Sequence, residues 1–126
     1  IEKDADDYQL ISENSQRFGL QNLVPVHGQA PEAWTELPDP DAIFIGGTGR
    51  GVAGICEQAF DRLKQGGRLV ANFSSLENLA SVYETLNRLA DSVNLRMINI
   101  CHGTYQLERV RFEAMNPTFL VSVVKE

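Results

Sequence analysis

The sequence predicts an α/β domain with a mostly parallel sheet, and three observations support this fold class. An apolar strand at residues 42–45 runs into four glycines within residues 46–51, and a helical pattern of apolar residues follows at residues 52–63. Strands and helices alternate along most of the chain, which is typical of a parallel sheet. The last two apolar segments, residues 95–100 and 117–124, have little helix potential between them. We therefore expect them to pair antiparallel across a loop or hairpin.

Composition and charge limit the classes to which this protein can belong. The chain has 126 residues, enough for a single domain, with 43% hydrophobic and 22% charged residues, which is typical of a globular protein. Its formal charge of −6 argues against a nucleic-acid partner, and no apolar run is long enough to span a bilayer. Cys56 and Cys101 have neither metal-ligand nor redox spacing, so no metal site is expected. These features predict a cytoplasmic location.

The first helix is expected directly after the N-terminal residues. Asp4 can cap it, and Gly19 suits its C-terminal end. Tyr8, Ile11 and Phe18 are expected on its buried side.

Two short elements are expected between this helix and the glycine-rich loop. Residues 23–26 read as a strand, in which Pro25 limits pairing. A brief helix is expected at residues 31–35, because proline is tolerated at the first positions of a helix.

After the helix at residues 52–63, the pair Gly66 and Gly67 indicates a stop, and residues 68–73 read as the next strand. Ser74 and Glu77 have the spacing of a capping box, which predicts a helix from there to about Ser92.

Several motifs along the chain resemble one family. They are Gly28-x-Ala30-Pro31-Glu32, Phe44-Ile45-Gly46-Gly47, the segment 63–72 and Asn116-Pro117. Together they resemble the decarboxylating precorrin methyltransferases of cobalamin biosynthesis. The resemblance implies a Rossmann-like class I S-adenosylmethionine-dependent methyltransferase fold, a single methyltransferase domain over residues 1–126, S-adenosyl-L-methionine as cofactor, a precorrin tetrapyrrole as substrate and a homo-oligomer. The net charge and the absence of a long apolar run predict no nucleic-acid or membrane partner. The family's first strand and its glycine-rich loop would lie before Ile1, so we expect this chain to be an incomplete half-site.

The resemblance assigns the cofactor site to Glu2, Lys3, Gly28, Gln29, Ala30 and Gly46. A carboxylate at the end of a strand can accept hydrogen bonds from both ribose hydroxyls, which is the role implied for Glu2. Lys3 would lie at the edge of the adenine ring. The small residues Gly28 and Ala30 would leave room for the base. Each of these residues also has a purely structural alternative, such as a solvated acid or an ordinary strand-to-helix connection.

Substrate contacts are implied for Gly47, Thr48, Arg50 and Asn72. Arg50 could clamp a carboxylate of the macrocycle with two parallel hydrogen bonds, or it could be a solvated arginine at a helix start. Asn72 would lie on the same rim, at the end of its strand. His27 and His102 are expected to be structural, and the sequence singles out no catalytic acid for the decarboxylation.

Other functions remain open at this stage. Another S-adenosylmethionine methyltransferase with a small-molecule substrate would share most of these features. A non-catalytic nucleotide-binding-like domain is a further alternative. An NAD-dependent oxidoreductase is disfavoured by the antiparallel final strand pair.

Overall fold

A computed structural model describes residues 1–47, 49 and 51–126. Its elements are α1 (Ala5–Arg17), the short 3-10 helix η1 (Glu32–Trp34), β1 (Ala42–Ile45), α2 (Val52–Arg62), β2 (Arg68–Phe73), α3 (Leu76–Leu89), β3 (Val93–Ile98), β4 (Cys101–Gln106), β5 (Arg109–Ala114) and β6 (Thr118–Val124). The described chain divides into two compact units, Ile1–Pro38 and Asp39–Glu126, and each is described by itself.

The first unit is built around α1. A carboxylate oxygen of Asp4 accepts hydrogen bonds from the backbone N–H groups of Asp6 and Asp7, at 3.0 and 3.1 Å, which confirms the predicted N-cap. The expectation for Phe18 was wrong: it is the C-cap residue, beyond the last full turn, and its side chain is 70% exposed. Tyr8 and Ile11 are half-buried.

The predicted strand at residues 23–26 is also wrong. The structure has only an isolated parallel bridge between Glu2 and His27, because Pro25 has no N–H to donate and Val24 is largely exposed. The brief helix expected at residues 31–35 is confirmed as η1.

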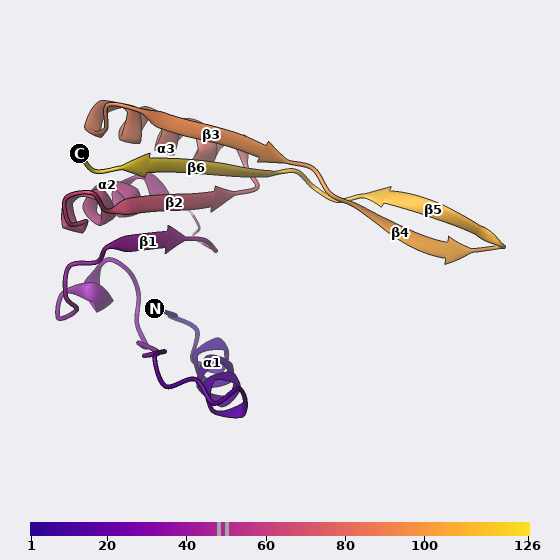
Figure 1. The fold of residues 1–126 in the computed structure, drawn as a ribbon, viewed down its shortest axis with the longest axis horizontal. Helices are drawn as coiled ribbons and strands as arrows, with labels where there is room; N and C mark the ends of the chain where they lie inside the picture. The colour runs from indigo at the N-terminus through magenta and orange to yellow at the C-terminus, as the bar shows by residue number, and fades with distance from the viewer. Residues whose placement is uncertain (48, 50) are drawn as a thin grey trace. The chain divides into compact units, whose positions relative to one another are not determined.

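The second unit contains a four-stranded sheet in the order β1-β2-β6-β3. β1 pairs with β2 in parallel, and β6 pairs antiparallel with both β2 and β3. β1, β2 and β3 therefore run in one direction and β6 runs against them, as the arrows in Figure 1 show. The predicted mixed α/β sheet with an antiparallel C-terminal strand pair is confirmed.

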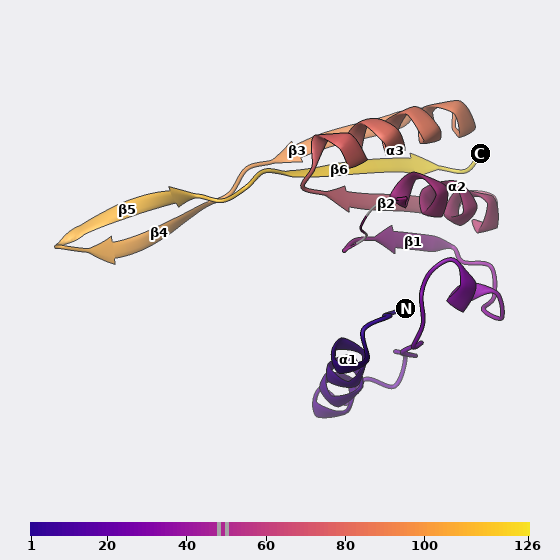
Figure 2. The same ribbon diagram turned by 180° about the vertical axis from the view of Figure 1, so that it is seen from behind.

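Helices α2 and α3 cover one face of this sheet, and Figure 2 shows them from the covered side. Every second residue of β2 points into this layer, and Leu69 and Ala71 are fully buried. The helices and β6 contribute further buried apolar side chains to the core: Val52, Cys56, Ala59, Phe60, Val82, Leu86, Val121 and Val123. The helical apolar pattern read at residues 52–63 is thus the core face of α2.

The start and end of α3 differ from the prediction by a few residues. Its N-cap is Ser75, whose hydroxyl accepts a hydrogen bond from the Asn78 N–H at 3.2 Å, whereas a box between Ser74 and Glu77 was expected. The helix ends at Leu89 rather than near Ser92, because Ala90 takes an extended conformation.

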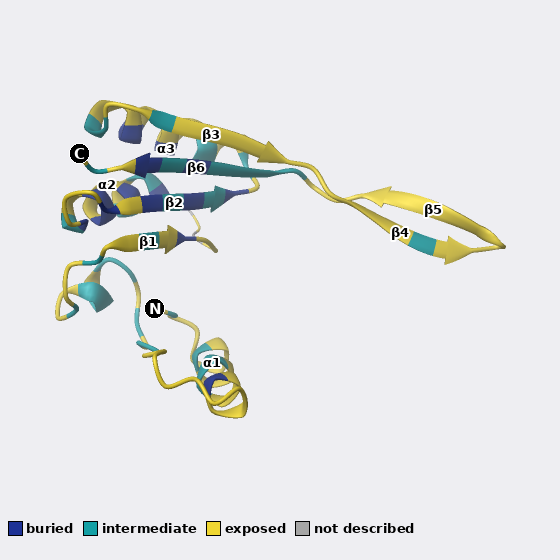
Figure 3. Ribbon diagram, viewed as in Figure 1, coloured by how far each residue is buried: buried dark blue, intermediate teal, exposed yellow. Residues whose placement is uncertain are grey.

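The segment between β3 and β6 forms a two-stranded antiparallel ribbon of β4 and β5, which was expected only as a loop or hairpin. Because β3 runs parallel to β2, the ribbon leaves the sheet at the edge formed by the carboxyl ends of β1, β2 and β3 (Figure 1). Figure 3 shows that almost the whole ribbon is exposed.

Candidate cofactor and substrate site

In the second unit, the candidate residues lie at the carboxyl ends of β1 and β2. Ile45 of β1 pairs in register with Ala71 of β2, and the next residues along the two strands are Gly46 and Asn72. The parallel pairing therefore brings these two predicted residues to the same edge of the sheet. Ligands of open α/β sheets bind outside this edge.

Asn72 lies on the face of the sheet that α2 and α3 do not cover. Its strand neighbours Ala71 and Phe73 are buried against the helices, while Asn72 itself is half-buried. Within the described part of the chain, its side-chain amide has no hydrogen-bond partner. A half-buried amide without a partner is available to both donors and acceptors of a ligand.

The glycines that follow β1 are exposed. Gly47 has a φ of 66°, in the left-handed region that favours glycine, and a Cβ there would meet no atom within 4 Å. A ligand could therefore approach this backbone closely. Thr48 and Arg50, the other two residues expected to contact substrate, lie outside the described residues.

In the first unit, the structure brings Glu2 and Gly28 together across 26 positions of sequence. The N–H of Glu2 donates to the carbonyl oxygen of Val26 at 3.0 Å, and the N–H of Gly28 donates to the carbonyl oxygen of Glu2 at 2.9 Å. Glu2 and Gly28, to which the sequence assigned different parts of the cofactor, are thus adjacent in the first unit.

The Glu2 side chain is half-buried and already has one partner. Its Oε1 accepts a hydrogen bond from the Asp4 N–H at 2.8 Å, which fixes the carboxylate beside the start of α1. Oε2 has no partner among the residues that the structure describes, so it can accept hydrogen bonds from a ligand. The carboxylate is therefore oriented and still has acceptor capacity.

The residues around Glu2 have structural partners. A ring nitrogen of His27 lies 3.2 Å from the carbonyl oxygen of Lys3, and the His27 ring stacks on Tyr8 with centroids 4.9 Å apart. The Lys3 side chain itself is exposed. His27 therefore connects the segment before Gly28 to Lys3 and to Tyr8 of α1, in line with the structural role expected for it.

Gly28 leads from this bridge into η1. Its φ is 153°, and a Cβ built there would lie 2.8 Å from the Cβ of Ala33, so no larger residue fits without a shift. The carbonyl oxygen of Gln29 accepts a hydrogen bond from the Ala33 N–H at 2.8 Å, while Gln29 is exposed and Ala30 half-buried. Close packing against Ala33 is enough to explain the glycine at this position. Its approach to the adenine ring stays a separate prediction.

One pocket of the second unit lies away from the sheet edge that holds Gly46 and Asn72. It has a volume of about 300 Å³ and is lined by residues such as Arg68, Asn94 and Val124, at the amino ends of β2 and β3. No cluster of metal-ligating side chains occurs in residues 1–47, 49 and 51–126. None of the helices in the described ranges has the length and apolar character needed to cross a bilayer.

Comparison with protein families identifies the chain. The model of the precorrin methyltransferase domain matches residues 1–125. The chain belongs to this family. The precorrin methyltransferase family was the one indicated by the motifs at Gly28 and Phe44.

Curated relatives are named as decarboxylating methyltransferases of precorrins or cobalt-precorrins. A cobalt-precorrin-6B C(15)-methyltransferase (decarboxylating) of Salmonella typhimurium is 32% identical over 133 aligned positions, which cover the whole of this chain. A precorrin-6Y C(5,15)-methyltransferase [decarboxylating] of a Sinorhizobium species is 42% identical over 93 residues, or 74% of this chain. The chain spans less than two thirds of these relatives: 65% of the first and 22% of the second.

Solved structures of the family have the same fold. A precorrin-6Y C5,15-methyltransferase of Geobacter metallireducens superposes with a TM-score of 0.86 at 30% identity, covering 98% of this chain and 65% of the other. A protein of Methanobacterium thermoautotrophicum described as precorrin 8w decarboxylase gives a TM-score of 0.87 at 30% identity, covering 96% and 66%. An S-adenosylmethionine-dependent O-methyltransferase of Thermotoga maritima, at 16% identity, shares the fold with a TM-score of 0.74. The Rossmann-like methyltransferase fold expected from the sequence is therefore confirmed.

One group of residues in this precorrin methyltransferase domain was missed from the sequence. Tyr105 and Phe112 are large aromatic residues that face solvent on the ribbon. Their signal was the alternation of apolar and polar residues through residues 101–106 and 109–114, which indicates strands with one apolar face.

Proposed function

We propose that the protein is an S-adenosylmethionine-dependent methyltransferase that methylates a carbon of a precorrin tetrapyrrole and removes carbon dioxide from an acetate side chain, as a step of cobalamin biosynthesis. The observation that carries this proposal is the family match over residues 1–125. It is supported by the ordered carboxylate of Glu2 and by the amide of Asn72, which has no hydrogen-bond partner among the described residues. Nucleic acid and membranes are not expected partners, and we propose a cytoplasmic location.

We assign cofactor contacts to Glu2, Lys3, Gly28, Gln29 and Ala30 in the first unit and, separately, to Gly46 in the second. Glu2 would accept hydrogen bonds from the ribose hydroxyls through Oε2, because Oε1 is held by Asp4. Lys3, Gln29 and Ala30 would line the adenine. When bound, S-adenosylmethionine supplies a methyl group on a positively charged sulfur.

The substrate half is assigned to Gly47, Thr48, Arg50 and Asn72. The role of these residues is to bind and orient: Arg50 and Asn72 would bind carboxylate and carbonyl groups of the macrocycle, and Gly47 would allow it close to the backbone. Methyl transfer needs the acceptor carbon aligned at roughly 3–3.5 Å, and such positioning can supply much of the rate acceleration. No general base is required of these side chains for the methyl transfer itself.

The proposal is tested by calorimetric titration with S-adenosylhomocysteine, the product of methyl transfer. The titration compares this chain with an extended form that has the length of the Salmonella typhimurium relative, of which the chain spans 65%. We expect micromolar binding by the extended form. Absence of binding to both forms would contradict the methyltransferase proposal and favour a non-catalytic nucleotide-binding-like domain.

The role of Glu2 is tested in the extended form with Glu2→Gln. The change should weaken binding by about tenfold or more, because a hydrogen bond to a charged acceptor contributes about 1.5–3 kcal/mol. The matched control is Asp6→Asn, which also removes one carboxylate near the start of α1 but from an exposed position. Equal effects of the two changes would contradict the assignment of Glu2.

A further inference from the structure

The carboxylate of Glu2 lies in a unit that has very little buried side-chain surface. Of residues 1–38, all of which the structure describes, only Ser15 is buried, so this unit contains no buried apolar core that could fix the segment around Glu2. A binding group is most effective when it is held close to its productive geometry before the ligand arrives. The orientation of Glu2 must therefore come from specific contacts around it.

Three hydrogen bonds hold Glu2 directly. Its N–H donates to the carbonyl oxygen of Val26 at 3.0 Å, and its own carbonyl oxygen accepts from the N–H of Gly28 at 2.9 Å. Its Oε1 accepts from the N–H of Asp4 at 2.8 Å. The first two bonds fix the backbone, whereas only the third fixes the carboxylate. The orientation of the carboxylate thus depends on where the Asp4 N–H points.

His27 acts on the same peptide unit as the Glu2 carboxylate. Its Nε2 lies 3.2 Å from the carbonyl oxygen of Lys3. Because a carbonyl oxygen can only accept, this contact assigns the proton to Nε2, which donates it. The Lys3 carbonyl and the Asp4 N–H belong to one planar peptide unit, so fixing the oxygen also fixes the direction of the N–H. The His27 ring therefore holds one side of this peptide unit, and Glu2 is bound to the other side.

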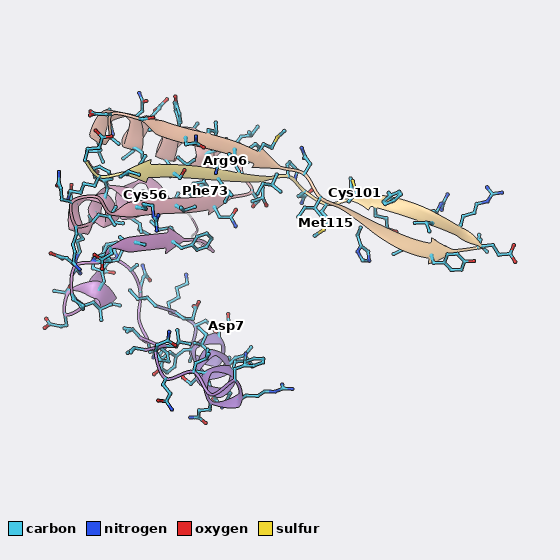
Figure 4. The ribbon with its side chains drawn as sticks, in the orientation of Figure 1. Asp7, Cys56, Phe73, Arg96, Cys101 and Met115 are labelled. Carbon is cyan, nitrogen blue, oxygen red and sulfur yellow. The ribbon has the colours of Figure 1, made fainter. Side chains whose placement is uncertain are left out.

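Tyr8 holds the ring of His27 in turn. The two rings stack with centroids 4.9 Å apart and an interplanar angle of 27°. The Tyr8 N–H donates to the carbonyl oxygen of Asp4 at 2.9 Å, so this ring projects from the start of the helix that Asp4 caps. Figure 4 labels Asp7, whose N–H donates to the Asp4 carboxylate at the same end of α1. The stack therefore ties the His27 ring to the start of α1.

We propose that His27 and Tyr8 are positioning residues of the cofactor site, which orient the Glu2 carboxylate through the peptide unit between Lys3 and Asp4. This inference rests on the proposed function, because Glu2 is assigned there to the ribose hydroxyls. Neither ring has to touch the ligand. Loss of either ring should therefore weaken recognition of the ribose hydroxyls more than it weakens the rest of cofactor binding.

The first test compares S-adenosylhomocysteine with its 2′-deoxy analogue, which lacks one ribose hydroxyl, by calorimetric titration of the extended form. The unaltered protein should bind the parent compound about tenfold or more tightly, because the analogue forms one hydrogen bond fewer with Glu2. His27→Ala and Tyr8→Leu should each lower this ratio by about threefold or more, since a rotated carboxylate forms a poorer hydrogen bond. An unchanged ratio in both variants would overturn the proposal, even if both affinities fell together.

Two further substitutions separate the contacts that His27 makes. His27→Gln keeps a side-chain N–H donor and should restore part of the ratio, whereas His27→Phe keeps a ring to stack on Tyr8 but has no donor. Restoration by phenylalanine but not by glutamine would overturn the proposed route through Lys3. The matched control for Tyr8→Leu is Phe18→Leu, which removes an aromatic ring from the other end of α1 and should leave the ratio unchanged.

A second measurement requires no ligand, so it distinguishes failure of this inference from failure of the proposed function. Amide hydrogen exchange, followed by NMR in the same extended form, reports the Asp4 N–H and hence its bond to the Glu2 carboxylate. His27→Ala should raise the exchange rate at Asp4 by about threefold or more, while residues 9–14 within α1 exchange as before. An unchanged rate at Asp4 would overturn the proposal. If the unaltered protein failed to bind S-adenosylhomocysteine, the proposed function would fail, and this rate would still decide whether His27 orients Glu2.

Discussion

The strands of the sheet and those of the ribbon have the same alternating pattern but opposite surroundings. In β2, the apolar residues Leu69 and Ala71 are fully buried beneath α2 and α3. In β5, the corresponding apolar residues Val110 and Phe112 are 59% and 76% exposed. Alternation in a sequence therefore predicts that a strand has an apolar face, but it does not say whether the same chain supplies the cover.

The two regions differ in the element that comes next along the chain after each strand. β2 leads into the fourteen-residue helix α3, which packs on the sheet, whereas β4 and β5 are joined directly by the turn at Leu107 and Glu108. Burial of apolar side chains stabilises the first region within one chain. Among the described residues, the apolar side chains of the second region are exposed and gain little of this stabilisation.

The largest expected effect comes from truncating one apolar residue in each region. Leu69→Ala should lower the free energy of unfolding by about 2–5 kcal/mol, because it leaves a cavity under α2 and α3. Phe112→Ala should change it by about 0.5 kcal/mol or less, since an exposed side chain loses little packing. Urea denaturation followed by circular dichroism measures both, in protein dilute enough that assembly does not contribute.

A large effect of Phe112→Ala in dilute protein would break this comparison. It would mean that the ribbon is covered within a single chain. A small effect of Leu69→Ala would instead mean that the helices do not pack on the sheet as described.

Most of the fold of the second unit could be predicted from the sequence. The strand at residues 42–45 and the helix beginning at Val52 follow from local apolar patterns, and each was predicted at its observed position. The errors lie where local patterns compete: both Ser74 and Ser75 can cap a helix, and only backbone geometry selects Ser75. The short strand at residues 23–26 failed because a strand depends on its pairing partner, which periodicity does not reveal.

The candidate site could be predicted only in part. Parallel pairing explains why Gly46 and Asn72 reach one edge, so this juxtaposition follows once two neighbouring strands are recognised. The contact between Glu2 and Gly28 depends on how the chain returns after α1. The family resemblance assigned both residues to the cofactor but did not predict this contact. The aromatic face of the ribbon was missed because solvent exposure of a whole strand pair is a tertiary property.

A smaller effect is expected from adding a methyl group in each region. A Cβ at Gly67 would lie 2.7 Å from the carbonyl oxygen of Lys64 and 3.3 Å from that of Asp41, so Gly67→Ala should destabilise the fold by about 1–3 kcal/mol. At Gly103 the nearest atoms are side-chain carbons of Phe112 and Val110 at 3.4 Å, an ordinary contact. Gly103→Ala should therefore stabilise the ribbon by about 0.5–1 kcal/mol.

Thermal and urea unfolding measure the change in stability caused by Gly67→Ala. Amide hydrogen exchange of residues 101–114 measures the change in ribbon stability caused by Gly103→Ala. Slower exchange in the ribbon with an unchanged sheet would agree with the prediction. Equal destabilisation by both changes would indicate that the ribbon is packed as tightly as the core, contrary to the comparison.

A further effect concerns the two cysteines, one in each region; it is absent at neutral pH and emerges only at alkaline pH. Burial raises the pKa of the Cys56 thiol from 9.0 to about 12, because the thiolate is poorly solvated in the core. Above pH 9 the thiol ionises in the unfolded chain but keeps its proton in the folded one. The unfolding free energy contributed by this group should therefore fall as pH rises from 9 toward 12.

Cys56→Ala should remove this component of the pH dependence, whereas Cys101→Ala should leave it in place. The measurement is urea denaturation of the chain and both variants between pH 8 and about pH 10.5, compared by the slope of unfolding free energy against pH. Comparing slopes separates the ionisation from the loss of packing that Cys56→Ala also causes at neutral pH. If Cys56→Ala and the unaltered chain had the same slope, the thiol at this position would be solvated in the folded state, and the layer between α2 and the sheet would be as open as the ribbon.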